Sequence, residues 1–206
     1  MRYFLFDASV VHHFYIPNAK YKKVLDYLLS ENQRGQSFFY LPSFCVAEVL
    51  NSFAKYRFRF KTLTAEKYKE VRDNFLDHVR YRKLFYCYDL HRYHNLNSDD
   101  VFEIEHSYDT EYTATETTFG DDLETIGKML KEKDKNDSIS KHYLSTYDIL
   151  LISMGMELRR ILKKNIYMLT KDKRLYNVCN EGFNQGKRFA RPLHLPQLTV
   201  QFLSRL

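Results

Sequence analysis

The stretch Arg2–Ser9 (RYFLFDAS) decides how the rest of the sequence is interpreted. Tyr3 to Phe6 are four consecutive apolar or aromatic residues, which predict a short buried strand, and Asp7 follows at once. A carboxylate at the end of a buried strand is unfavourable unless something pairs with it. Asp7 therefore either caps the next helix or holds a cation, and the remaining sequence must distinguish these two roles.

Further apolar runs alternate with segments of helical periodicity. The expected strands are 2–7 (RYFLFD), 36–43 (QSFFYLPS), 84–90 (LFYCYDL), 165–170 (NIYMLT) and a short strand near the end of the chain. Helices are expected from Ser43, from Thr64 as an N-cap, from Thr146 and from Lys173. This alternation predicts an α/β fold with a doubly wound parallel sheet flanked by helices. Ligands in such sheets bind at the carboxyl ends of strands, where the strand order switches.

Length and charge favour a single basic domain, 1–206, with an acidic insertion. From Asp89 to Asp137 the chain has 14 acidic and 5 basic residues, a net charge of −9. The remaining residues are 27 basic and 12 acidic, a net charge of +15. We interpret 91–137 as an acidic insertion or elaborated crossover, with helices expected over 98–107 and 121–133. The basic body favours an anionic partner such as nucleic acid.

Cysteine usage and hydropathy predict a cytoplasmic protein. Cys45, Cys87 and Cys179 are odd in number and lack CxxC spacing, which favours a reducing compartment over a disulfide framework. The first residues lack a signal-peptide pattern, and no apolar run approaches the roughly 20 residues that cross a bilayer. We therefore expect no membrane partner.

Four acidic residues stand out by their position relative to the expected strands. Asp7 ends the first strand, Glu48 lies early in the helix after the second, Asp148 opens the helix after the insertion, and Asp172 follows the strand 165–170. All four can converge on the carboxyl edge of a parallel sheet. Carboxylates gathered there repel one another, and a divalent cation such as Mg²⁺ or Mn²⁺ relieves that repulsion.

These segments together resemble the PIN domain family of nucleases, and within it the VapC-like toxins. The motif pieces are FDAS (6–9), LPSFCVAEVLNSF (41–53), LSTYDILLISMG (144–155) and YMLTKDKRL (167–175). The resemblance covers roughly residues 1–89 and 144–195, whereas the acidic segment departs from the shorter crossover of the family. It implies a PIN-like fold and a Mg²⁺- or Mn²⁺-dependent endoribonuclease, whose hydrolysis of RNA leaves a 5′-phosphate and a 3′-hydroxyl.

The resemblance also implies roles for individual residues and partners. Asp7, Glu48, Asp148 and Asp172 would be the catalytic, metal-binding acids. The small polar residues Ser9, Asn51 and Thr170 would orient a carboxylate or water, and Lys171 and Lys173 would contact substrate phosphate. A toxin would have an antitoxin partner, and homodimers are common in the family.

Structural roles account for each acid taken singly. Asp7 and Asp148 could cap helices, Glu48 could be a solvated helix residue, and Asp172 could form a turn. A non-catalytic nucleic-acid-binding protein of the same fold and a structure-specific DNA nuclease are the alternative functions.

Two other kinds of motif bear on function. The pairs His12-His13 and His91-x-x-His94 lack companion ligands at zinc spacing, so we expect surface or loop positions for them. The segments 55–61 (KYRFRFK) and 80–83 (RYRK) interleave aromatic and basic residues. For the basic face as a whole this pattern favours single-stranded nucleic acid, whereas for any single residue it favours an amphipathic helix with its aromatic rings in the core.

Overall fold

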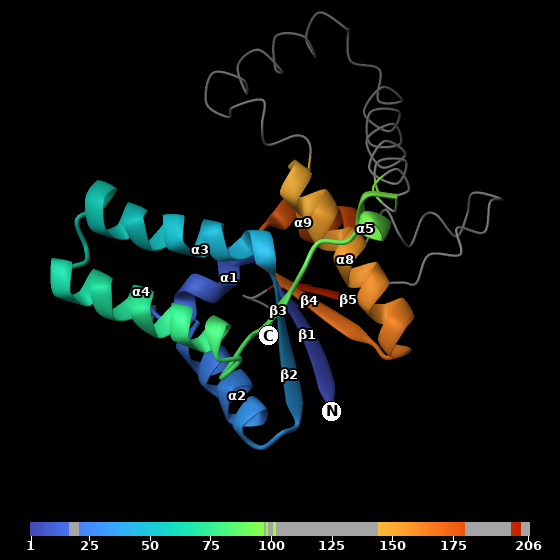
Figure 1. Ribbon diagram of the computed structural model, residues 1–206, viewed down its shortest axis with the longest axis horizontal. Helices are drawn as coiled ribbons and strands as arrows, with labels where there is room; N and C mark the ends of the chain where they lie inside the picture. The colour runs from blue at the N-terminus through green and yellow to red at the C-terminus, as the bar shows by residue number, and fades with distance from the viewer. Residues whose placement is uncertain (17–20, 97, 99–100, 102–143, 180–198, 203–206) are drawn as a thin grey trace, which may run out of the picture.

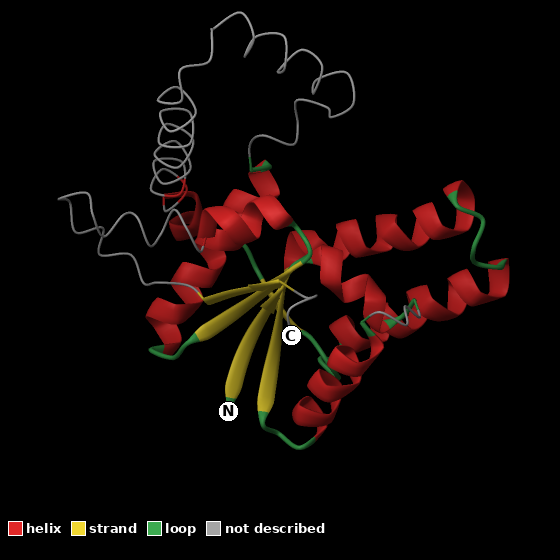
Figure 2. Ribbon diagram, turned by 180° about the vertical axis from the view of Figure 1, so that it is seen from behind, coloured by secondary structure: helices red, strands yellow, loops and turns green. Residues whose placement is uncertain are grey.

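The computed structural model describes residues 1–16, 21–96, 98, 101, 144–179 and 199–202. Their centre is a five-stranded sheet in the order β3-β2-β1-β4-β5, with all neighbouring strands parallel (Figure 2). The strands are β1 (Arg2–Phe6), β2 (Ser37–Pro42), β3 (Tyr86–Tyr88), β4 (Ile166–Thr170) and β5 (Thr199–Phe202). The predicted parallel α/β sheet is therefore confirmed.

Helices cover both faces of the sheet (Figure 1). One side carries α1 (Ala8–Val11), the 3₁₀ turn η1 (His12–Phe14), α2 (Lys22–Gln33), α3 (Ser43–Ala54), the π-helical turn η2 (Lys55–Arg59) and α4 (Ala65–Arg80). The other side carries α5 (Arg92–Leu96), α8 (Thr146–Leu162) and α9 (Lys173–Asn177). No helix in the described part of the chain combines the length and apolar character needed to cross a membrane.

Two hydrophobic cores explain why the apolar run of β1 is uninterrupted. Successive side chains of a strand point to opposite faces of the sheet. Phe4 and Phe6 enter the core beneath α1–α4, whereas Leu5 enters the core beneath α8 and α9. Because both faces are covered, β1 has no solvent side, and the strand reads as continuously apolar.

The strand order places the switch point between β1 and β4. From β1 the chain adds β2 and then β3 on one side, and it later returns to the other side of β1 with β4 and β5. The carboxyl ends of β1 and β4 therefore flank the position where ligands bind in open α/β sheets.

Several expected element boundaries and environments are different in the structure. The third strand spans only Tyr86–Tyr88, and a short helix that was not expected, α5, spans Arg92–Leu96. Of the helix expected over 98–107, only Ser98 and Val101 are described, and both are helical; the rest lies outside the described residues. The helix expected over 121–133 lies outside the described residues.

The expectation that the histidine pairs lie at the surface is wrong for three of the four residues. His12, His13 and His94 are all buried. His94 accepts a hydrogen bond at Nδ1 from the His91 backbone N–H (2.7 Å), and its Nε2 lies 3.2 Å from the Tyr88 hydroxyl. The ring therefore fixes the start of α5 against β3, because its two nitrogens reach polar groups that burial would otherwise leave unpaired.

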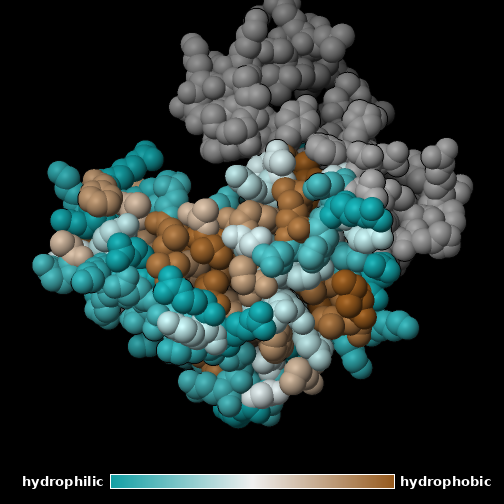
Figure 3. Space-filling view, viewed as in Figure 1, coloured by the Kyte–Doolittle hydropathy of each residue, from teal (hydrophilic) through white to brown (hydrophobic). Residues whose placement is uncertain are grey.

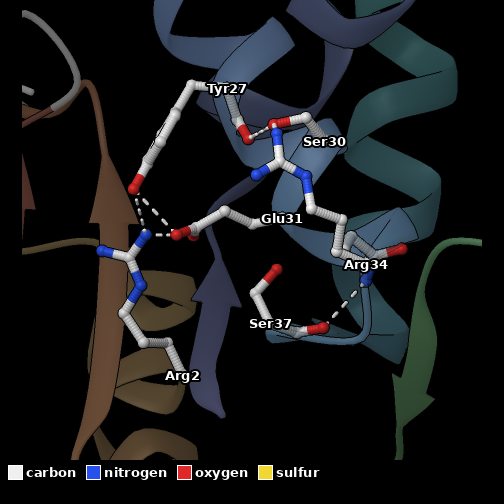
Figure 4. A network of polar contacts seen from close by, with 7 residues as sticks. Arg2, Tyr27, Ser30, Glu31, Arg34 and Ser37 are labelled. Atoms are coloured by element: carbon white, nitrogen blue, oxygen red, sulfur yellow. Dashed lines mark hydrogen bonds and ion pairs between the residues drawn. The ribbon is translucent and has the colours of Figure 1, made fainter.

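A polar network fastens the amino end of β1 to α2 (Figure 4). The Arg2 guanidinium forms an ion pair with Glu31, and the Tyr27 hydroxyl donates to Glu31 Oε1 at 2.8 Å. Burial alone would raise the pKa of Glu31, but the hydrogen bonds from Arg2 and Tyr27 bring it below its ordinary value. This network lies at the edge of the sheet opposite Asp7.

Replacing Glu31 with Ala is expected to lower the free energy of unfolding by about 1–2 kcal/mol, because Arg2 loses its anion and Tyr27 its acceptor. The lowered pKa means that this contribution is present at neutral pH and is lost as the pH falls through the folded-state value. Urea unfolding at pH 7 measures it. Glu70→Ala, which removes an exposed pair with Lys67, is the matched control and should change stability by less than about 0.5 kcal/mol. Equal effects of the two substitutions would contradict the assignment.

Candidate functional site

The four acids predicted from the sequence lie on elements that meet at the carboxyl edge of the sheet. Asp7 directly follows β1, and Asp172 follows β4 by two residues. Glu48 is the sixth residue of α3, the helix that leaves β2, and Asp148 is in the first turn of α8. Asp7 and Asp172 thus flank the switch point from its two central strands.

Asp7 is the buried centre of this edge, with 9% of its surface exposed. Its Oδ1 accepts the backbone N–H of Ser9 at 3.2 Å, which makes Asp7 the N-cap of α1. Its Oδ2 accepts the hydroxyls of Ser9 and of Thr170, the latter at 2.7 Å. The carboxylate is therefore held in one orientation by groups from α1 and from β4.

Thr170 and Ser9 connect the two sides of the switch point. Thr170 is fully buried, and its hydroxyl oxygen also accepts the backbone N–H of Asp172 at 2.8 Å. The Ser9 hydroxyl accepts the backbone N–H of Lys171 at 3.1 Å. Small hydroxyl side chains fit here because larger ones would separate β1 from β4. Both residues touch Asp7, while their role in orienting a bound ion or water stays a prediction.

Asp148 and Asp172 also make local helix contacts. Ser145 is the N-cap of α8, and Asp148 Oδ2 accepts its backbone N–H at 2.9 Å and its hydroxyl at 2.6 Å, which completes a capping box. Asp172 is the N-cap of α9 through a 2.9 Å hydrogen bond from the Leu175 N–H. The local signals Ser145-x-x-Asp148 and Asp172-x-x-Leu175 therefore account for how these segments fold.

Electrostatic repulsion links the four carboxylates to one another. Burial raises the pKa of Asp7, and the charge of Asp172 raises it further. Burial also raises the pKa of Glu48, as do the charges of Asp7 and Asp148. The pKa of Asp148 rises to about 6, again mainly through burial, with added repulsion from Asp7 and Asp172. Each acid thus lies within the field of at least one other, and negative charge accumulates at this edge.

Cys45 belongs to the same environment, although the sequence analysis did not single it out. Its thiol is buried beneath the acids, and burial together with the charges of Asp7 and Glu48 raises its pKa well above the ordinary value. The same thiol forms a hydrogen bond with Glu48, one turn later on α3. The i, i+3 spacing of a cysteine and an acid on one helix was the signal available for this contact.

Lys171 is held beside the acids by two buried rings. Its Nζ lies 2.8 Å from His13 Nε2 and 5.0 Å from the centre of the Tyr21 ring. Burial lowers the pKa of His13 to about 3, and the neighbouring His12 and Lys171 lower it too, so the neutral imidazole accepts from the ammonium group. His13 was missed from sequence because nothing local connects it to a residue 158 positions later.

The remaining residues predicted from the sequence are Asn51, which has no described contact with the four acids, and Lys173. Asn51 is exposed on α3, one turn after Glu48, and Lys173 is the first residue of α9. Among the described residues, no group of three His, Cys, Asp or Glu side chains is placed so that it could hold a metal ion. The acids therefore share an electrostatic field, but their side chains do not form a ready three-ligand site.

The donor chemistry nevertheless fits a hard divalent cation. All four candidate ligands are carboxylates, and Mg²⁺ is commonly held by only one or two of them, together with waters and substrate phosphate. Burial, and after it the charge of the neighbouring acids, raises the pKa of Asp7, Glu48 and Asp148, and a bound cation would offset that penalty.

Comparison with known proteins adds no family to this description. No protein-family model matches the chain, and no curated protein matches it. Any function assigned to the acidic edge of the sheet must therefore be argued from the edge itself.

Proposed function

We propose that this chain is a Mg²⁺- or Mn²⁺-dependent endoribonuclease of the PIN type. The observation that carries the proposal is the mutual repulsion of Asp7, Glu48, Asp148 and Asp172 at the switch point of a parallel sheet. Like-charged carboxylates gathered at one edge, with Asp7 buried and Glu48 and Asp148 half-buried, destabilise a protein that has no use for them. A fold that retains four at the usual ligand position is best explained by a cation and an anionic substrate.

The residues present would divide the chemistry as follows. Asp7, Glu48, Asp148 and Asp172 would hold the cation, which supplies positive charge to activate a water and to stabilise the phosphate oxygens. Ser9 and Thr170 fix the Asp7 carboxylate through their hydroxyls. Lys171 lies next to the edge, and the positive charge of the chain outside 89–137 would attract RNA.

The direct test measures cleavage of an end-labelled single-stranded RNA with Mg²⁺ or Mn²⁺. We expect EDTA to stop the cleavage and Asp148→Asn to reduce its rate strongly. A DNA strand of the same sequence should be cleaved more slowly than the RNA. Cleavage that persists in EDTA and in the variant would refute the metal-dependent mechanism. Preferential cleavage of DNA would instead support the structure-specific DNA nuclease.

A second candidate is a non-catalytic nucleic-acid-binding protein of the same fold. The capping hydrogen bonds of Asp7, Asp148 and Asp172 favour it, because they give each of these acids a structural reason to be present. Calorimetric titration with Mn²⁺ separates the candidates, since this protein would bind RNA but would show no saturable metal binding that Asp7→Asn removes. A toxin role additionally predicts an adjacent reading frame that encodes an antitoxin.

Metal binding is expected to stabilise the protein, and more so at pH 7.5 than at pH 5.5. The folded-state pKa of Asp148, about 6, lies above its unfolded value of 3.8, so its charge lowers stability as the pH rises through this range. A free cation concentration of 100 times the dissociation constant would add about 2.7 kcal/mol to the free energy of unfolding at pH 7.5. At pH 5.5 the gain shrinks because the cation must first displace a proton.

Thermal unfolding with and without Mn²⁺ at the two pH values checks this prediction. Asp148→Asn is the control, because it should abolish most of the difference between the two pH values. A melting temperature that does not respond to Mn²⁺ or Mg²⁺ at pH 7.5 would contradict it.

A further inference from the structure

The turn that joins α3 to α4 carries an unusual set of side chains. Residues 55–61 (KYRFRFK), here called the aromatic-basic tip, comprise η2 and the two residues after it. The two helices run side by side, and the tip lies at their end farthest from the sheet (Figure 1). In the space-filling view this end is mainly hydrophilic, with isolated apolar side chains among the charged ones (Figure 3).

Phe58 and Phe60 project into solvent from the aromatic-basic tip. Their exposed fractions are 68% and 54%, whereas the other phenylalanines among residues 1–96 are all buried or half-buried. The alternative of an amphipathic helix with its aromatic rings in the core is therefore wrong for these two residues. Exposed phenylalanine rings lose the free energy that burial would supply, so two of them together call for a partner.

Hydrogen bonds hold the tip in a defined conformation. The Phe60 N–H donates to the Lys55 carbonyl at 2.9 Å, and the Thr62 N–H donates to the Tyr56 carbonyl at 2.9 Å. The Arg57 guanidinium donates to the Leu63 carbonyl at 3.0 Å. The rings are thus presented by ordered backbone, which lowers the entropy lost when a partner binds.

The charge of the tip identifies the kind of partner. The tip contains Lys55, Arg57, Arg59 and Lys61, and no acidic residue occurs from Lys55 to Ala65. The Arg57 and Arg59 guanidinium carbons lie 5.9 and 5.7 Å from the centres of the Phe58 and Phe60 rings. The Lys and Arg side chains suit the phosphates of a nucleic acid, and unpaired bases stack on exposed aromatic rings and on guanidinium planes.

Helix α3 connects the tip to the acidic edge. Glu48 and Phe58 are ten residues apart, which corresponds to about 15 Å along a helix. Lys55, in the tip, is close enough to Glu48 for its positive charge to lower the pKa of that carboxyl, which partly offsets the increase caused by burial. A strand of nucleic acid bound at the tip can therefore reach the acids along α3.

We propose that the aromatic-basic tip binds single-stranded nucleic acid by stacking unpaired bases on Phe58 and Phe60, while Arg57 and Arg59 contact the phosphates. That the strand is RNA and not DNA rests on the proposed function. That its bases stack on the two rings is argued from the tip alone. The tip gives the chain a binding surface separate from its acids, and it selects single strands because paired bases cannot present their faces to the rings.

The test measures binding without cleavage. Fluorescence anisotropy of a labelled single-stranded RNA of twenty uridines, with the full chain in EDTA, gives the dissociation constant of the wild type and of each variant. We expect F58A/F60A to weaken binding at least about tenfold, and F58Y/F60Y to stay within about threefold. R57Q/R59Q should reduce the salt-dependence slope by about 1.4, for two lost phosphate contacts.

Tyr93→Ala is the matched control. Tyr93 is 49% exposed and has Arg92 over its ring at 5.0 Å, but it lies on α5, on the other side of the sheet. Its loss should leave binding unchanged within about twofold. If F58A/F60A misfolds by circular dichroism, F58L/F60L serves instead, since it keeps apolar bulk but removes the ring face.

The outcomes separate this proposal from the nuclease assignment. Unchanged binding by the double variant, an equal loss with Tyr93→Ala, or no binding of the RNA by the wild type would overturn the role of the tip. Cleavage with Mn²⁺ is measured independently, so an intact chain that binds through the tip but does not cleave refutes only the nuclease.

Discussion

Asp7→Asn is expected to reduce Mn²⁺-dependent RNA cleavage by roughly 100-fold or more, about 3 kcal/mol of transition-state stabilisation. The substitution removes the most buried charge of the acidic edge but keeps its shape. The Asn carbonyl oxygen can still accept the Ser9 N–H and cap α1, because Asn is as good an N-cap as Asp. Steady-state cleavage rates at saturating Mn²⁺ measure the effect.

The thermal stability of Asp7→Asn distinguishes a lost ligand from a lost fold. Burial raises the pKa of Asp7, so its ionised form costs stability at neutral pH. Removing the charge therefore offsets the loss of the Oδ2 acceptor for the Ser9 and Thr170 hydroxyls, and the metal-free variant should melt close to the wild type. Asp26→Asn, an exposed acid on α2, is the matched control and should retain full activity. Full activity in Asp7→Asn, or a large drop in its melting temperature without metal, would remove the basis of the nuclease proposal.

Phe6→Ala is expected to lower the free energy of unfolding by about 3–5 kcal/mol, the range measured for buried phenylalanines in other proteins. Phe6 is fully buried, and its ring centre lies 4.9 Å from that of Phe39 and 5.6 Å from those of Phe14 and Phe85. Removing the ring leaves a cavity that three other aromatic side chains line. Equilibrium denaturation in urea gives the change directly.

Phe58→Ala provides the same chemical change at an exposed position. We expect it to alter stability by no more than about 0.5 kcal/mol, because it opens no cavity. A loss of less than about 1.5 kcal/mol for Phe6→Ala would show that the core beneath α1–α4 relaxes around the missing ring.

The sequence carried most of the information about the sheet. Apolar runs before Asp7 and Asp172 predicted β1 and β4, since a strand covered on both faces needs no polar alternation. Thr64 marked the start of α4 correctly because an N-cap is a local signal. The placement of the four acids at one edge followed from the parallel topology alone.

Other features were not accessible from local patterns. The burial of His12 and His13, and the contact of His13 with Lys171, depend on a packing partner far away in the sequence. The sequence left open whether the rings of 55–61 face the core, and helical periodicity could not decide it because a π-helical turn shifts the register after Ala54. The capping contacts of Asp148 and Asp172 were weighed as structural alternatives, and the structure contains them alongside the shared electrostatic field.

The bond between Thr170 and Asp7 joins residues 163 positions apart, which has a consequence for protein synthesis. Asp7 is synthesised well before Thr170, and β4 must be inserted beside β1 before this contact can exist. Contacts between such distant residues close late in folding. We therefore expect nascent chains released before Ile166 to lack the assembled acidic edge, and under the proposed function such incomplete products would not cleave RNA.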